Sequence, residues 1–128
     1  MFKLFKKKEK VLTDKEHVDL LWKLWVKEEL PSPVGELLTV ISNLGASGHA
    51  DFFEFCETDK TLANAVEVSF SLLPKLIQEN YAIAKIAYLT TAKEDRGENF
   101  LEEYDNVFYD NENLIDGLLL DFAKRFVD

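Results

Sequence analysis

Hydrophobic residues in this chain recur at spacings of three and four, the period of an amphipathic α-helix. No stretch alternates apolar and polar residues for long enough to predict a β-strand. The pattern therefore predicts an all-α fold, a single compact multi-helix domain of about five to seven helices. Helical periodicity covers residues 14–30, 34–44, 61–73, 75–92, 100–108 and 114–126, with a short helical stretch over 49–56.

Local signals predict where these helices begin or break. Thr13 and Glu16 have the spacing of a capping box. In such a box the threonine hydroxyl accepts a hydrogen bond from the Glu16 amide, and the glutamate carboxylate accepts one from the threonine amide. Ser32 is a good N-cap, and Pro33 suits the first helical position, where a missing amide costs nothing. Pro74 predicts a kink or a new start after the third long helix.

A glycine turn leads directly into the densest aromatic cluster of the chain. Asn43 and Gly45 predict the end of the second helix, and Gly48 continues the turn. Phenylalanines follow at once, so we expect them to be placed inward by the turn. The expected inward residues are Phe52, Phe53 and Phe55, and Phe108 of a later helix is expected to be a core anchor together with Phe52 and Phe53.

The segment of residues 75–92 is apolar nearly all round. Leu76, Ile77 and Tyr81 fall on one face, whereas Ile83 and Ile86 fall on neighbouring faces. Such a pattern predicts a central helix with little exposed surface.

The charge of the chain is divided unevenly. Its 128 residues suit one domain, and its net charge is −9. Five lysines and one glutamate give residues 1–10 a charge of +4, which leaves −13 for the rest. We therefore expect a basic N-terminal tail, residues 1–12, and a helical domain, residues 13–128. The acidic body repels nucleic acid, so we expect a basic protein partner and no direct nucleic-acid contact.

The basic tail leaves two alternatives open. No long apolar section follows its lysines, so it does not predict a secretory signal, and no apolar run approaches the ~20 residues of a membrane-spanning helix. A solvated tail is the simpler interpretation. The other is contact with a membrane surface through Phe2 to Lys10, since the lysines attract anionic lipid.

Few residues are candidates for catalysis or metal binding. The lone Cys56 excludes an intramolecular disulfide, fits a cytoplasmic location, and is expected to be buried and inert. His49 precedes it by seven residues, about 10.5 Å of helical rise, which is beyond hydrogen-bond reach. His17 and His49 lack a metal-binding spacing, and the neighbouring carboxylates of Asp51 and Glu54 are commonplace on helices. We therefore predict a protein that is not an enzyme, with no catalytic residue, metal or cofactor.

An acidic run fills much of the C-terminal half, with Arg96 as its only cation. Glu98, Glu102 and Asp105 follow a four-then-three spacing, which predicts one helical stripe of carboxylates. One interpretation is a solvated face that keeps the protein soluble. The other is a polyanionic surface that binds a basic protein, with an affinity that falls steeply with salt. The acidic residues are Glu94, Asp95, Glu98, Glu102, Glu103, Asp105, Asp110, Glu112 and Asp116.

Two motifs carry a resemblance to a known family. The turn Ser47-Gly48-His49-Ala50-Asp51-Phe52-Phe53 resembles the Asn-Gly-Gly-Phe type turn, leading into Gln and paired aromatics, of the DNA-mimic-protein-like family of small helical bacterial domains. Tyr104-Asp105-Asn106-Val107-Phe108-Tyr109 is similar to the family's Leu-Asp-x-x-Phe-Tyr pattern, with tyrosine in place of leucine. Ala65-Val66-Glu67 and Pro74-Lys75-Leu76 resemble its middle helices. Ser47, His49 and Asp51 depart from the family's turn.

The resemblance implies an α-helical domain whose acidic surface imitates DNA and binds a DNA-binding protein, such as a transcription regulator. We therefore predict a cytoplasmic, acidic protein-interaction module. Two other functions stay open, a membrane-surface accessory protein tethered by the basic tail and an immunity protein against a basic toxin. A homo-oligomer also stays open.

Overall fold

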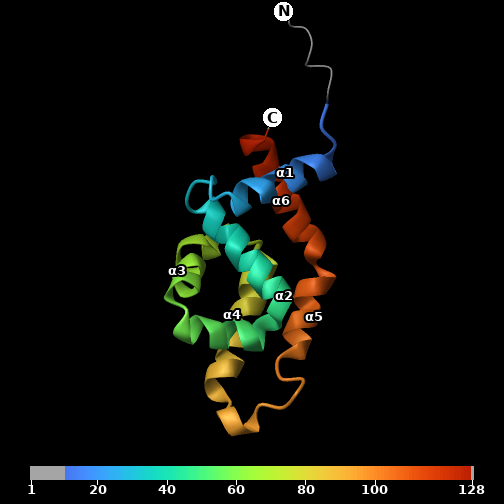
Figure 1. The fold of residues 1–128 in the computed structure, drawn as a ribbon. Helices are drawn as coiled ribbons and strands as arrows, with labels where there is room; N and C mark the ends of the chain where they lie inside the picture. The colour runs from blue at the N-terminus through green and yellow to red at the C-terminus, as the bar shows by residue number, and fades with distance from the viewer. Residues whose placement is uncertain (1–10, 128) are drawn as a thin grey trace, which may run out of the picture.

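The computed structural model describes residues 11–127, which fold into six α-helices joined by turns and loops and contain no strand (Figure 1). The prediction of an all-α domain is confirmed. The predicted membrane contact through Phe2 to Lys10, and most of the predicted basic tail, lie outside the described residues. The helices are α1 (Asp14–Val26), α2 (Val34–Thr58), α3 (Lys60–Ser69), α4 (Lys75–Thr90), α5 (Glu102–Asp110) and α6 (Glu112–Phe126), with 3-10 turns η2 (Phe70–Leu72) and η3 (Lys93–Asp95).

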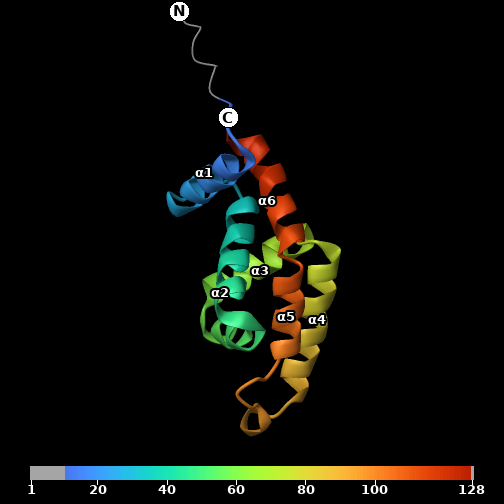
Figure 2. The ribbon, with the colours of Figure 1, turned by 90° about the vertical axis from the view of Figure 1, so that its right-hand side faces the viewer.

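Helix α2 is the centre of the fold. It packs against α3, α4 and α5, whereas α1 lies mainly across α6 (Figure 1). Helices α4 and α5 run side by side in opposite directions (Figure 2). No helix among residues 11–127 is both long enough and apolar enough to cross a membrane.

The first helix begins where its capping box predicts. The Thr13 hydroxyl accepts a hydrogen bond from the Glu16 amide at 3.1 Å, and the Glu16 carboxylate accepts one from the Thr13 amide at 2.8 Å. The helix ends at Val26 rather than near residue 30, and Glu28 then adopts a left-handed φ of 58°. The expected end was therefore too late by about one turn.

The second helix starts and turns differently from the expectation. Ser32 is not its N-cap, because Pro33 occupies that position and the Ser32 hydroxyl donates to Glu36. The helix also continues through Gly45, so the prediction that this glycine closes it was wrong. The turn lies at Gly48, whose φ of 81° and ψ of 169° kink α2 between two helical halves.

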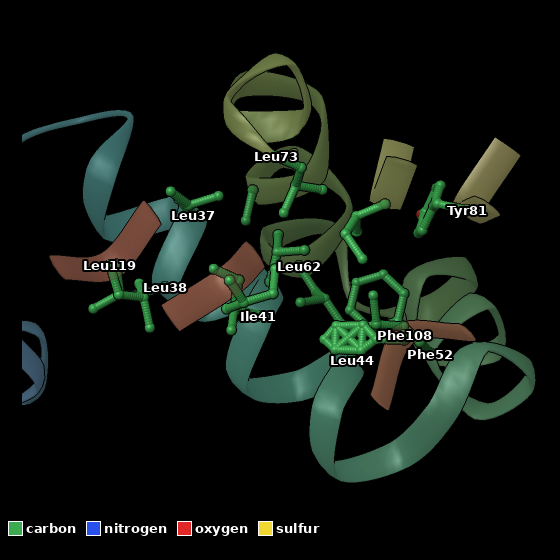
Figure 3. Packing of buried hydrophobic residues seen from close by; sticks show 14 of the residues in the cluster. Leu37, Leu38, Ile41, Leu44, Phe52, Leu62, Leu73, Tyr81, Phe108 and Leu119 are labelled. Carbon is green, nitrogen blue, oxygen red and sulfur yellow. The ribbon is translucent and has the colours of Figure 1, made fainter. Parts of the chain in front are cut away.

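The expected aromatic anchors, two after the glycine turn and one in α5, are buried in the core. Phe52, Phe53 and Phe108 are 0%, 1% and 3% exposed, and Figure 3 draws Phe52 and Phe108 as members of the buried cluster that also contains Leu44. The rings of Phe53 and Tyr81 pack edge to face, with 5.0 Å between their centroids. Phe55 was expected inward but is 46% exposed, because the kinked half of α2 turns only one side to the core.

The later helices follow the predicted order with shifted ends. Pro74 separates η2 from α4, as a proline that cannot continue a helix should. The expectation that α4 has little exposed surface was wrong, because Ile83 and Ile86 are 55% and 62% exposed. Helix α5 starts only at Glu102, after Leu101 adopts a left-handed φ of 65°.

Replacing Gly48 with alanine is expected to destabilise the fold by about 1–3 kcal/mol, since its positive φ suits glycine. An added Cβ would also lie 2.7 Å from Asp105 Oδ2. The matched control is Gly117→Ala in α6, where nothing lies within 4 Å and alanine should stabilise by about 0.5–1 kcal/mol. Urea unfolding of both variants checks this, and equal effects at the two glycines would contradict it.

Candidate functional site

The two motifs singled out in the sequence meet across the fold, at the kink of α2. Asp105 Oδ1 of α5 accepts a hydrogen bond from the His49 backbone N–H, with 2.7 Å between the oxygen and the amide nitrogen. The same oxygen lies 2.7 Å from Nδ1 of the His49 ring. An ionised carboxylate only accepts, so Nδ1 carries the proton and donates. The Tyr109 hydroxyl adds a third link by donating to the Gly45 carbonyl oxygen at 2.9 Å.

Gly48 allows this close approach. The Asp105 carboxylate occupies the space where any other residue at position 48 would carry its Cβ, with Oδ2 only 2.7 Å from that point. The glycine is therefore required twice, once for its positive φ and once for the space beside Asp105.

The His49 side chain is buried among aromatic rings. It is 1% exposed, and Phe53, Tyr81 and Phe108 lie 5.9, 6.1 and 6.4 Å from it between ring centroids. With Nδ1 bound to Asp105, the other nitrogen, Nε2, is buried without a hydrogen-bond partner. Burial lowers the pKa of His49 below its ordinary 6.5, although the Asp105 carboxylate opposes this.

The geometry does not activate Cys56 through His49. The thiol is half-buried, and its burial raises the pKa of Cys56 above the ordinary value, which disfavours the nucleophilic thiolate. Since His49 Nδ1 is bound to Asp105, it is not aimed at a thiol. Within residues 11–127, no group of three or more acidic, histidine or cysteine side chains could hold a metal ion.

Asp51 and Glu54 lie in a shallow hollow of about 260 Å³. Both are exposed, and cationic Lys93 and Arg96 line the same hollow. The Arg96 guanidinium carbon lies 4.0 Å from the centre of the Tyr88 ring, and Arg96 donates to the carbonyls of Tyr88 and Thr91. The only cation of the acidic run is therefore attached to the end of α4 rather than to the carboxylates around it.

The acidic run does not form the predicted stripe. Glu98 precedes α5, and the left-handed residue Leu101 turns the chain between Glu98 and Glu102. Asp105 is also not a free surface carboxylate, because it is only 21% exposed and is bound to His49. Tertiary contact has thus changed the role expected of Asp105 from partner binding to holding the kink.

The other eight acidic candidates are all exposed. Among the described residues, none of them forms an ion pair with a lysine or arginine. They are distributed over η3, the following loop, α5 and α6 rather than on one helix face: Glu94, Asp95, Glu98, Glu102, Glu103, Asp110, Glu112 and Asp116.

Sequence reasoning missed the partnership of His49 with Asp105. The two residues are 56 positions apart, and no local spacing connects them. The available signal was that each one lay inside a motif of the same family resemblance. The sequence indicated both motifs as notable but gave no reason to place them together.

Comparisons with known proteins give no match among family models, curated proteins or solved structures. The resemblance to the DNA-mimic-protein-like family therefore remains a prediction that is carried by its motifs.

Asp105→Ala is expected to destabilise the fold by roughly 3 kcal/mol or more, because it leaves two donors of His49 without their charged acceptor. Asp105→Asn should cost less, since its amide oxygen still accepts from one donor. Asp110→Ala, an exposed acid of the same helix, should change stability by about 0.5 kcal/mol at most. Chemical unfolding measures all three, and a neutral Asp105→Ala would contradict the role given to Asp105.

Acidification is expected to weaken the fold through His49. Since burial lowers the folded pKa, the unfolded chain binds more protons below pH ~6.5, and stability is lost as the pH falls through that value, by up to about 1.4 kcal/mol per pH unit. The His49→Gln variant should not show this loss of stability on acidification, whereas the His17→Gln variant should still show it. Unfolding free energies measured between pH 5 and 8, roughly the histidine range, check this. The same pH slope in wild type and His49→Gln would refute it.

Proposed function

We propose that this protein is a non-enzymatic acidic interaction module that binds a basic protein. The observation that carries the proposal is the set of eight exposed carboxylates between Glu94 and Asp116, none of them paired with a described lysine or arginine. Arg96 does not neutralise them by pairing, because its guanidinium is stacked on Tyr88 and bonded to backbone carbonyls. Such a surface attracts and orients a cationic partner over long range.

The class of partner follows from the charge and the family resemblance. Carboxylates at several positions can stand in for phosphates toward lysines and arginines that normally contact nucleic acid. A DNA-binding protein, such as a transcription regulator, has the complementary surface. In this proposal α5 and α6 hold five of the eight carboxylates in place, and the Asp105 link keeps α5 against α2.

Neutralising Glu98, Glu102 and Glu112 by Gln substitution is expected to weaken partner binding about tenfold to a hundredfold, because each exposed charge contributes modestly. The purified protein would be used as bait at low salt in extracts of its source cells, and the recovered basic proteins quantified by mass spectrometry. A recovered DNA-binding protein should also be displaced from the bait by duplex DNA.

The control removes the same number of charges elsewhere, by combining Glu29→Gln, Glu67→Gln and Asp121→Asn, all at exposed positions. This triple variant should retain binding, which separates the location of the carboxylates from the total charge. Equal loss in both triple variants, or recovery of no basic protein by the wild type, would contradict the proposed function.

A further inference from the structure

Helix α4 carries an exposed apolar face that nothing in residues 11–127 covers. Its large side chains Leu76, Ile83, Ile86 and Leu89 are 42%, 55%, 62% and 67% exposed, and Ala82 beside them is exposed as well. These five residues, termed the α4 face, recur at helical spacing along ~20 Å of the helix. Apolar residues that are exposed together on one surface mark interaction sites, whereas apolar residues exposed singly are normal.

Helix α5 forms one border of the α4 face. The two helices lie side by side (Figure 2), and Asn80 Nδ2 of α4 donates to the Tyr104 carbonyl of α5 at 2.9 Å. Asp105 and Tyr109 point toward α2, to which they are hydrogen-bonded. The opposite side of α5 therefore carries the residues at the complementary helical positions, among them Glu103 and Asp110, both exposed.

The charges around the α4 face are mainly negative. Glu79 lies within it, Glu103 and Asp110 are exposed on α5, which packs beside α4, and Glu94 and Asp95 follow the end of α4 in η3. The cations of this region are placed less centrally. Lys75 and Lys93 lie beyond the two ends of the face, and Lys85 is turned toward α2, with Nζ 5.1 Å from the centre of the Phe53 ring.

We propose that the α4 face binds a cationic amphipathic helix of the basic partner. This inference rests on the proposed function and adds to it the form of the partner segment. The apolar side of such a helix would cover Ile83 and Ile86, while lysines or arginines on its margins would reach Glu79 and the α5 carboxylates.

The border charges decide between this occupant and a second copy of the chain. A second copy would bring its own Glu79, Glu103 and Asp110 toward the same carboxylates, and like charges brought together in an interface cost binding energy. The α4 face is also short, since α4 has only 16 residues, whereas a stable dimer buries about 800 Å² on each partner. A cationic helix meets both the apolar face and its negative border.

The test uses a synthetic leucine–lysine peptide as long as α4, 16 residues, with leucines at helical spacing on one side. A scrambled peptide of the same composition is the reference probe, and isothermal titration measures both. The wild type is expected to bind the amphipathic peptide at least about tenfold more tightly than the scrambled one, and Ile83→Ser with Ile86→Ser should remove that preference.

The control variant carries Val68→Ser and Leu114→Ser, which replace exposed apolar residues of α3 and α6 and should retain the preference. Circular dichroism shows that each variant has kept its helices. Glu79→Gln, Glu103→Gln and Asp110→Asn together should weaken both peptides and flatten the salt dependence of binding.

Failure of the inference differs from failure of the proposed function. If both peptides bind equally and salt-sensitively, and the Ile83 and Ile86 substitutions change nothing, the α4 face is not the binding site. The proposed acidic interaction module would then still stand. No binding of either peptide would overturn both. Self-association of the wild type that Ile83→Ser abolishes would identify a second copy as the occupant. Binding that requires deletion of residues 1–10 would identify the chain's own basic segment. Either of these results overturns the inference.

Discussion

The contact between Asp105 and the kink of α2 is the constraint on which most of the structure depends. One carboxylate oxygen accepts from the backbone and the ring of His49, while the same side chain fills the space beside Gly48. The kink turns the second half of α2 so that Phe52 and Phe53 enter the core. Because α5 supplies the carboxylate, the position of α5 and the path of α2 are determined together.

The same contact determines which acidic residues remain on the surface. Asp105 is bound to α2, and Tyr109 beside it donates to Gly45, so this side of α5 faces the core. The carboxylates on its other sides stay in solvent, and α5 itself packs beside α4. The attachment of α5 to α2 therefore determines which of its carboxylates are exposed for the proposed interaction.

Much of the fold was predictable from local chemistry. The Thr13 and Glu16 capping box, the break at Pro74 and the burial of Phe52, Phe53 and Phe108 each follow from short spacings and side-chain type. The candidate site was less predictable. The acidic run was visible in the sequence, but its expected stripe was broken by the left-handed Leu101, and Asp105 turned out to bind His49. The sequence alone does not distinguish a carboxylate that faces solvent from one that is bound to a buried histidine.

The helical character of the chain, the start of α1 and the strongly acidic charge were settled by residues close to one another in the chain, because capping and amphipathic periodicity act over three or four positions. Two features were decided only when distant segments came together. One is which residues of α4 are buried, and the other is that α2 turns at Gly48 rather than at Gly45. Both glycines permit a turn, but only Gly48 faces a carboxylate that needs its missing side chain. Likewise, Ile83 and Ile86 are apolar in any fold, and their exposure reflects the absence of a covering helix among residues 11–127.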